Sequence, residues 1–249
     1  MSWHALVQTH KELPSTNDLA KELARQGAPE GTTVIARQQT AGRGRLGRSF
    51  HSPEGAGLYM SVVLRPHCAP QELMHLTCAV AVAACDAVET TAGVRPGIKW
   101  INDLTLGSKK LGGILTELAF TPNGLVDFAV IGIGINCGAA LTEFPSELKD
   151  IACSLDGRAT PEALAMALVD RLEQMNEELL SQRSVWMDRY RRDCVTLGRQ
   201  IKVISPTAVR QGLARQVNDD GSLTVLFEDG QIQAVSAGEV SVRGLWDYI

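Results

Sequence analysis

The chain has 249 residues, of which 45% are hydrophobic and 21% charged, and its formal net charge is −4. This composition excludes a disordered or collagen-like chain. The acidic excess argues against a dedicated nucleic-acid-binding protein, whose surface is expected to be basic. The length allows one substantial core with a small appended module, or two modest domains.

Neither a secretory leader nor a membrane span is predicted. The N-terminus has no basic region followed by an apolar run, and the most apolar stretch, Leu76 to Cys85, is shorter than the ~20 residues that a membrane-spanning helix needs. We therefore expect a cytoplasmic protein that does not bind a membrane. The six cysteines form no Cys-x-x-Cys pair, which predicts buried, reduced thiols rather than disulfides or a metal site.

The first part of the chain alternates between helical and strand-like patterns. Ser15 or Thr16 can cap a helix that stops near Gly27. A second helix is predicted over residues 70–88, where apolar residues recur at three- and four-residue spacing. Strands are predicted for residues 32–36, 58–64, 98–106, 113–119 and 126–135. The last three are separated by turn residues and predict an antiparallel meander.

The last part of the chain changes in style. Helices are predicted over residues 161–180 and 185–194. Short strands joined by turns, typical of a small barrel, are predicted at 201–204, 212–217, 223–227 and 232–235. We place a domain boundary near Leu197, giving domains 1–197 and 198–249. The fold class is α+β: a mixed, mainly antiparallel sheet with helices packed on it, followed by a small β module.

The segment from Gly42 to Ser49 holds three arginines and three glycines within eight residues. Glycines let the backbone approach an anion closely, and guanidinium groups match the geometry of phosphates and carboxylates. The segment therefore predicts a site for a polyanionic small molecule. A solvated basic loop and nonspecific contact with nucleic acid stay open as alternatives for the loop alone.

Two familiar motifs overlap this segment without their structural context. It fits G-x-G-x-x-G and nearly fits the P-loop, with Arg48 in place of the lysine. The residues that follow, Phe50 to Gly55, cannot open a helix, and no acidic residue stands at the distance that a dinucleotide site requires. Without that helix, the loop also lacks the helix dipole that helps both motifs to bind phosphate.

Polar residues and glycines interrupt the predicted meander. A regular strand over 98–106 would place Lys99 and Asp103 on one face and Asn102 on the other, where they need a ligand or one another. A structural Lys99–Asp103 ion pair is the alternative to a site. Glycines follow Lys110 and recur at Gly132 and Gly134, which predicts a slot for a flat organic group, with a bulge or tight packing as the alternative.

Taken together, five segments in order resemble the motif series of biotin protein ligases: 15–17, 39–48, 99–103, 110–115 and 132–136. The resemblance covers roughly residues 10 to 240. It implies a class II synthetase-like catalytic core with an SH3-like C-terminal barrel. It also implies an ATP-dependent ligase that forms biotinyl-5′-AMP and transfers biotin to a lysine of a biotin carboxyl carrier protein. Because the first motif begins at Ser15, we expect a short form without a DNA-binding domain.

The resemblance also implies the roles of individual residues. Catalytic cations would be Arg43, Arg45 and Lys110. Biotin would be bound by Ser15, Thr16, Asn17, Gln39, Arg43, Gly44, Arg45, Lys110, Gly113, Gly132 and Gly134. ATP, accompanied by Mg²⁺, would be bound by Arg45, Arg48, Phe50, Lys99, Asn102 and Asn136. No protein ligand of a metal is predicted.

Three residues depart from the family's pattern: Phe50, Ile101 and Cys137 stand where tryptophan, proline and an aliphatic residue are common. Phe50 keeps an aromatic face for adenine. The nearest alternative is a lipoate or octanoate ligase or transferase of the same fold, in which Cys137 would be the candidate nucleophile. A noncatalytic module that binds nucleotide or nucleic acid through the basic loop is the second alternative. The acceptor protein and the oligomeric state, including a homodimer, stay open.

Overall fold

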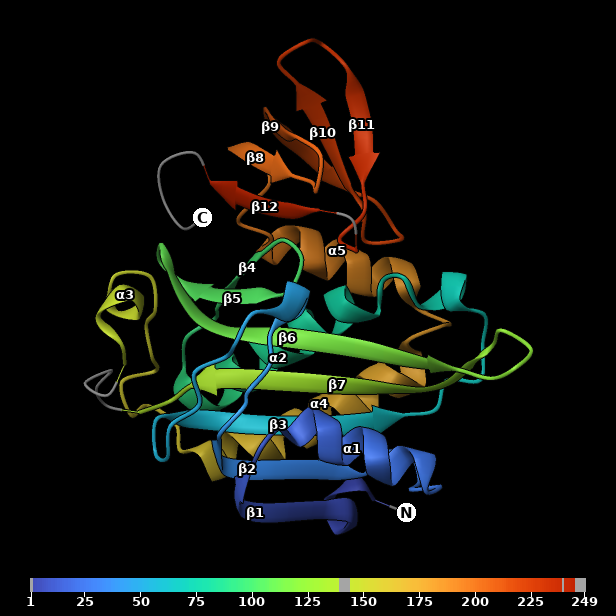
Figure 1. Ribbon diagram of the computed structural model, residues 1–249, viewed down its shortest axis with the longest axis vertical. Coiled ribbons are helices and arrows are strands. Elements are labelled where there is room, and N and C mark those ends of the chain that lie inside the picture. Colours follow the sequence, from blue (N-terminus) through green and yellow to red (C-terminus); the bar gives the residue numbers. More distant parts are fainter. Residues whose placement is uncertain (1, 139–143, 239, 245–249) are drawn as a thin grey trace.

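The computed structural model describes residues 2–138, 144–238 and 240–244. A seven-stranded sheet with the order β1-β2-β3-β7-β6-β5-β4 forms its centre (Figure 1). Only β1 and β2 pair in parallel, and the other neighbours are antiparallel. The strands are β1 (Val7–Leu13), β2 (Thr33–Gln39), β3 (Gly57–Leu64), β4 (Gly97–Lys99), β5 (Asp103–Leu106), β6 (Lys109–Phe120) and β7 (Val126–Asn136).

Helices cover both faces of this sheet. The helix α1 (Thr16–Arg25) packs on β2, β3 and β7, and α2 (Leu76–Ala92) and α4 (Pro161–Glu178) pack together on the opposite face (Figure 1). A further helix, α5 (Arg183–Asp193), packs on α2. The short elements are η1 (Trp3–Leu6), η2 (Arg45–Gly47), η3 (Pro70–Leu73) and α3 (Ser146–Lys149).

The strand β3 shows how the sheet separates a core face from a site face. Its even-numbered residues, including Met60 and Val62, join the large core beneath α2 and α4. Val63 instead joins Ala20 and Ala24 in a second cluster under α1. Because strand side chains alternate, Ser61 also faces α1. A polar residue on a fully buried strand is thereby placed at the start of that helix.

A second sheet with the order β11-β10-β9-β8-β12 follows α5. Its strands are β8 (Gln200–Ile204), β9 (Val209–Val217), β10 (Leu223–Phe227), β11 (Ile232–Val235) and β12 (Ser241–Gly244). The mixed α+β fold is confirmed. Among the described residues the pairings run from β11 to β12 without closing, so the SH3-like barrel stays a prediction.

The two sheets share one hydrophobic core. Residues of α2, of β4 and of the strands β8 to β10 belong to the same buried cluster. Trp100 Nε1 donates a hydrogen bond of 2.9 Å to the carbonyl of Gly221, in the turn between β9 and β10. The second sheet is therefore seated on the first through apolar packing and a buried polar contact.

The predicted single strand over residues 98–106 is wrong. The chain reverses at Trp100–Asn102, so that β4 and β5 pair antiparallel and Lys99 stands opposite Asp103. The sequence carries no glycine or proline at this turn, and the apolar residues Trp100 and Ile101 are buried in it. The sequence analysis also missed the strands β1 and β12. The residues of β1 are at least partly exposed and do not alternate regularly between buried and exposed.

One helical stretch, residues 70–92, is long and apolar enough to cross a membrane by length and composition alone, and so exceeds the shorter run read from the sequence. Of its most apolar window, 72% is buried inside the structure. The stretch includes α2, which packs on the sheet beside α4 and so has the position of a core helix. All six cysteines are unpaired and five of them are buried, as predicted.

Candidate active site

A cluster of polar side chains lies at the start of α1, between the helix and the sheet. The backbone N–H of Thr16 donates to Gln39 Oε1 at 2.9 Å, and Gln39 Nε2 donates to Ser52 Oγ at 3.0 Å. The Ser61 hydroxyl lies 2.7 Å from Thr16 Oγ1 and 2.6 Å from Asn17 Oδ1. The cluster is buried but polar, which suits recognition of a small polar ring.

Ser15 is the N-cap residue of α1, yet its side chain makes no capping hydrogen bond. It is 2% exposed, and its hydroxyl has no hydrogen-bond partner among the described residues. A buried hydroxyl left unpaired costs free energy, about 1–3 kcal/mol. Ser15 lines the cavity of about 130 Å³ described below.

The arginine–glycine segment forms a compact hairpin. Phe50 N donates to Gly42 O at 2.8 Å, Gly44 N donates to Arg48 O at 2.7 Å, and a bridge pairs Arg43 with Ser49. A Cβ atom at Gly42 would collide with the Phe50 carbonyl, so only glycine allows this closure. The loop thus has structure of its own.

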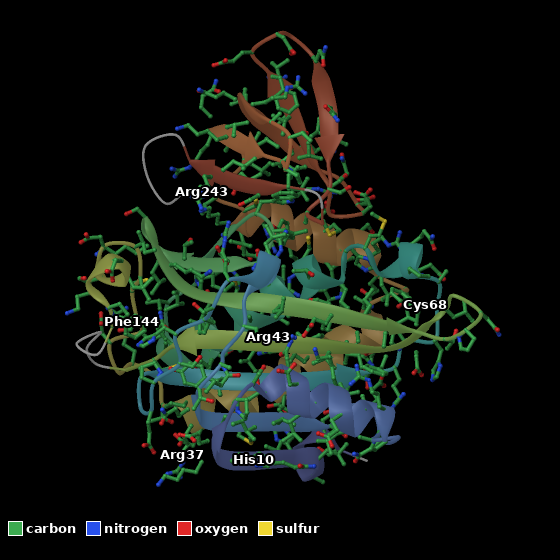
Figure 2. All side chains as sticks on the ribbon, in the orientation of Figure 1. His10, Arg37, Arg43, Cys68, Phe144 and Arg243 are labelled. Atoms are coloured by element: carbon green, nitrogen blue, oxygen red, sulfur yellow. The ribbon has the colours of Figure 1, made fainter. Side chains whose placement is uncertain are left out.

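The three arginines of this loop contact different elements. Arg43 pairs with Glu117 of β6 and with Asp18 of α1. Arg45 donates to Asn102 Oδ1 at 2.9 Å and to the carbonyl of Ala237, and burial lowers the pKa of its guanidinium. Arg48 reaches Ser241 of β12 at 3.4 Å. Figure 2 shows Arg43 over the strands beside α1, and Arg243 on β12 next to the main sheet.

The β4–β5 hairpin and β6 supply further charges. Lys110 Nζ pairs with Asp103 Oδ1 at 2.6 Å. Lys99 is 6% exposed, and burial lowers its pKa to about 8. Asn102 donates to the carbonyl of Ile114 at 2.9 Å and accepts from Arg45. Asp103 thus binds Lys110, and it also stands opposite Lys99 across the β4–β5 pair, where its charge partly offsets the effect of burial on the pKa of Lys99.

These groups surround one cavity of about 130 Å³ on the α1 side of the sheet. A second cavity, of about 710 Å³, shares several lining residues with the first, including Arg48, Phe50, Asp103 and Lys110. Asn136 lines only the second, and its Oδ1 has no hydrogen-bond partner among the described residues. The first cavity is lined by the candidate residues Ser15, Thr16, Asn17, Gln39, Arg43, Gly44, Arg45, Arg48, Phe50, Lys99, Asn102, Lys110, Gly113, Gly132 and Gly134.

The slot expected over Gly132 and Gly134 is filled by side chains of the chain itself. A Cβ atom at Gly132 would strike the amide of Asn17, and one at Gly134 would lie 2.5 Å from Phe50 Cε1. The Phe50 ring also stands edge-on to Tyr59, with 6.4 Å between the ring centroids. Phe50 therefore lies inside the slot rather than beyond it, and a ligand over Gly134 must displace the ring.

Sequence reasoning missed three polar residues of the site: Ser61, Ser52 and Glu117. A serine or glutamate within an apolar strand is typical of a solvent-facing position, so no motif distinguished them. The strand pairing places Ser61 opposite Gly132. Glu117 binds both Asn17 and Arg43, and these bonds lower the pKa of its carboxyl although its partial burial acts to raise it. Ser61 and Glu117 lie in strands beside β7, which carries Gly132 and Gly134, but only the strand order of the folded sheet reveals this.

Comparison with known proteins identifies the family to which this fold belongs. The model of the biotin/lipoate A/B protein ligase family matches residues 10–136, and that of the biotin protein ligase C-terminal domain matches residues 196–243. The biotin--[acetyl-CoA-carboxylase] ligase of Mycobacterium tuberculosis is 34% identical over 236 residues, which are 91% of this chain and 85% of that protein. The chain belongs to the biotin protein ligases. This membership was expected from the five motifs.

Two further relatives of this ligase family are informative. The bifunctional ligase/repressor BirA of Bacillus subtilis is 48% identical over 150 residues, 60% of this chain. The chain spans 46% of the length of that relative. A structure of the biotin protein ligase from Aquifex aeolicus in complex with biotin and ATP has a TM-score of 0.80 and 28% identity, and the match covers 96% of this chain and 98% of that one.

Proposed function

We propose that the chain activates biotin with ATP to biotinyl-5′-AMP and transfers the biotin to a lysine of a biotin carboxyl carrier protein. The observation that carries this proposal is the convergence on one cavity of a buried polar cluster and of Arg43, Arg45 and Lys110. The cluster of Ser15, Thr16, Asn17 and Gln39 recognises the ureido ring. Membership of the biotin protein ligases supports the choice of biotin.

In the first step the biotin carboxylate attacks the α-phosphorus of ATP and pyrophosphate leaves. Two anions must meet, so fixed cations near the reacting atoms lower the barrier. Lys110 and the arginines of the loop supply these cations. Lys110 lines both cavities and so stands between the biotin end and the wider ATP end. The nucleotide would be bound by Asn136 in the wider cavity, by Arg48 where the two meet, and by Lys99 and Asn102 in the first.

Mg²⁺ accompanies ATP and is held mainly by the phosphate oxygens, as is common for this ion. Among the described residues no group of three or more His, Cys, Asp or Glu is arranged to hold a metal. Asp103, whose carboxylate lines both cavities, is bound to Lys110 at 2.6 Å. The residues around the cavities therefore fit an Mg²⁺ ion that arrives bound to ATP.

In the second step the uncharged amine of the acceptor lysine attacks the carbonyl of biotinyl-5′-AMP, and AMP leaves. The mixed anhydride must be shielded from water until then. The hairpin of residues 42–50 covers the cavity and is the element that shields it. The division into domains 1–197 and 198–249, a cytoplasmic location and the absence of DNA binding stay predictions.

The lipoate or octanoate alternative has a specific weakness. A transferase of that kind needs a reactive thiol, but Cys137 is 1% exposed, its Sγ contacts the carbonyl of Ile135, and burial raises its pKa to about 11. A buried thiol of high pKa is a poor nucleophile. Within the noncatalytic alternative, nucleic-acid binding is weakened because the loop arginines line a cavity rather than a flat surface.

Calorimetric titration with biotin, with and without a nonhydrolysable ATP analogue, tests the proposal. We expect biotin to bind and lipoate to fail as a competitor, and biotin to drive exchange of pyrophosphate into ATP. Preference for lipoate would establish the alternative acid. Nucleotide binding with no biotin-dependent exchange would establish the noncatalytic module.

A further inference from the structure

Glu117 stands at the point where the biotin end of the cavity meets the arginine–glycine loop. It lies in β6 opposite Val130, on the face that packs against α1. Its Oε2 accepts a hydrogen bond of 2.8 Å from Asn17 Nδ2 and also pairs with the guanidinium of Arg43. Its Oε1 accepts from Lys21 Nζ at 3.1 Å. Glu117 Oε2 therefore binds one residue of the polar cluster, Asn17, and one residue of the arginine–glycine loop, Arg43.

The contact with Asn17 determines which way the amide of that residue points. An ionised carboxylate only accepts hydrogen bonds, so the NH₂ group of Asn17 must face Glu117. Asn17 Oδ1 then lies 2.6 Å from the Ser61 hydroxyl, over Gly132. The Asn17 side chain is thereby held between the Glu117 carboxylate and the Ser61 hydroxyl. Its amide therefore presents its donor and its acceptor to a ligand in one fixed orientation.

The contact with Arg43 determines where the loop rests. Arg43 forms ion pairs with Glu117 and with Asp18, so its guanidinium is bound by carboxylates of the protein. The side chain of Glu117 is 28% exposed and that of Asp18 is 50% exposed. Charged hydrogen bonds at such half-buried positions are moderate in strength and can be exchanged for those of an anionic ligand.

We infer that Glu117 is a positioning residue that couples the ureido end of the site to the arginine–glycine loop. It orients Asn17 for biotin and holds Arg43 against β6 until the phosphoryl group competes for that arginine. The inference rests on the proposed function, because biotin is the ligand whose binding Glu117 prepares. Glu117 itself touches neither substrate.

Asp18 offers a matched control. It pairs with Arg43 and with Lys21, as Glu117 does, but it makes no contact with Asn17. Glu117→Gln removes the charge and keeps the shape at a partly exposed position, so the variant should fold. Its side-chain amide carries donors as well as an acceptor, so it no longer forces the NH₂ group of Asn17 to face it. Asp18→Asn removes one of the two carboxylates that hold the loop and leaves the Asn17 amide with its acceptor.

The experiment combines biotin-dependent pyrophosphate exchange with cleavage by trypsin. Glu117→Gln should raise the KM for biotin about tenfold while kcat changes less than threefold, and Asp18→Asn should leave the KM for biotin within twofold of wild type. Without ligand, both variants should be cut by trypsin after the loop arginines several-fold faster than wild type, at an unchanged Tm. Mass spectrometry locates the cuts at Arg43, Arg45 and Arg48.

Three outcomes would overturn the coupling. One is a Glu117→Gln chain that matches wild type in both readouts. Another is an equal rise in the KM for biotin in Glu117→Gln and Asp18→Asn, which would trace the effect to surface charge. A wild-type chain that binds no biotin would overturn the proposed function and the coupling with it, and is distinguished by calorimetry on the wild type alone.

Discussion

Replacing Gly132 by alanine should damage the biotin end of the site while leaving the loop arginines in place. All three terminal atoms of Asn17 lie within 3.0 Å of the position that a Cβ atom would take, whereas ordinary contact begins at 3.4 Å. The amide must therefore withdraw by on the order of 1 Å. That shift breaks the 2.6 Å contact with Ser61 and the 2.8 Å bond to Glu117.

The lost hydrogen bonds set the size of the effect. A neutral bond contributes about 1 kcal/mol and one to a charged group about 1.5–3 kcal/mol. We expect the Kd for biotin to rise at least about tenfold, since tenfold corresponds to about 1.4 kcal/mol. The free energy of unfolding should fall by about 1–3 kcal/mol, as in other overpacked cores.

Calorimetry with biotin and thermal unfolding measure the two quantities. Gly238→Ala is the control, because a Cβ atom there meets nothing within 4 Å and the backbone is not left-handed. It should match wild type in both. Wild-type biotin affinity in Gly132→Ala would refute the claim that Asn17, seated over Gly132, recognises the ligand.

Four further changes test the remaining roles. Arg43→Ala should impair formation and retention of the adenylate in a pyrophosphate-release assay without lowering Tm, and equal activity would reject its role. Lys110→Ala should slow the first step by at least about a hundredfold, and a wild-type rate would contradict the assignment. Cys137→Ala should keep pyrophosphate exchange and acyl transfer to the carrier protein within twofold, whereas loss of acyl transfer would favour the transferase. Burial lowers the pKa of Lys99 to about 8, so the folded chain disfavours the charged form. The destabilisation caused by burying charged Lys99 is therefore fully present below pH 8, and it decreases as the pH rises toward the pKa of lysine in the unfolded chain. Lys99→Met should raise Tm at pH 7 and weaken ATP binding. An unchanged Tm would contradict this destabilisation.

Much of the fold could be predicted because its elements carry strong patterns. The helix at residues 161–178 has regular apolar spacing, and the strands β3, β6 and β7 are long and rich in apolar residues. The edge strand β1 could not be predicted, since its residues are mostly exposed and no face alternates. The reversal at Trp100–Asn102 could not either, because buried tertiary contacts rather than turn residues determine it.

The residues of the candidate site were found by motif, but their resting contacts were not. Lys110 was predicted as a cation, whereas its pairing with Asp103 depends on the β5–β6 register. The glycines at 132 and 134 predicted missing side chains, yet only the three-dimensional packing shows that Asn17 and Phe50 occupy the space. Glu117 gave no signal, because its importance comes from neighbours a hundred residues away in the chain.

The hydrogen bond from Trp100 to Gly221 and the apolar cluster around it make the second sheet inseparable from the first. A fragment ending near Leu197 would leave the indole nitrogen without its acceptor and expose the end of α2 to water. The two units should accordingly melt in a single calorimetric transition. Chimeras that exchange the C-terminal unit between relatives need to carry the matching surface of α2 and α5 with it.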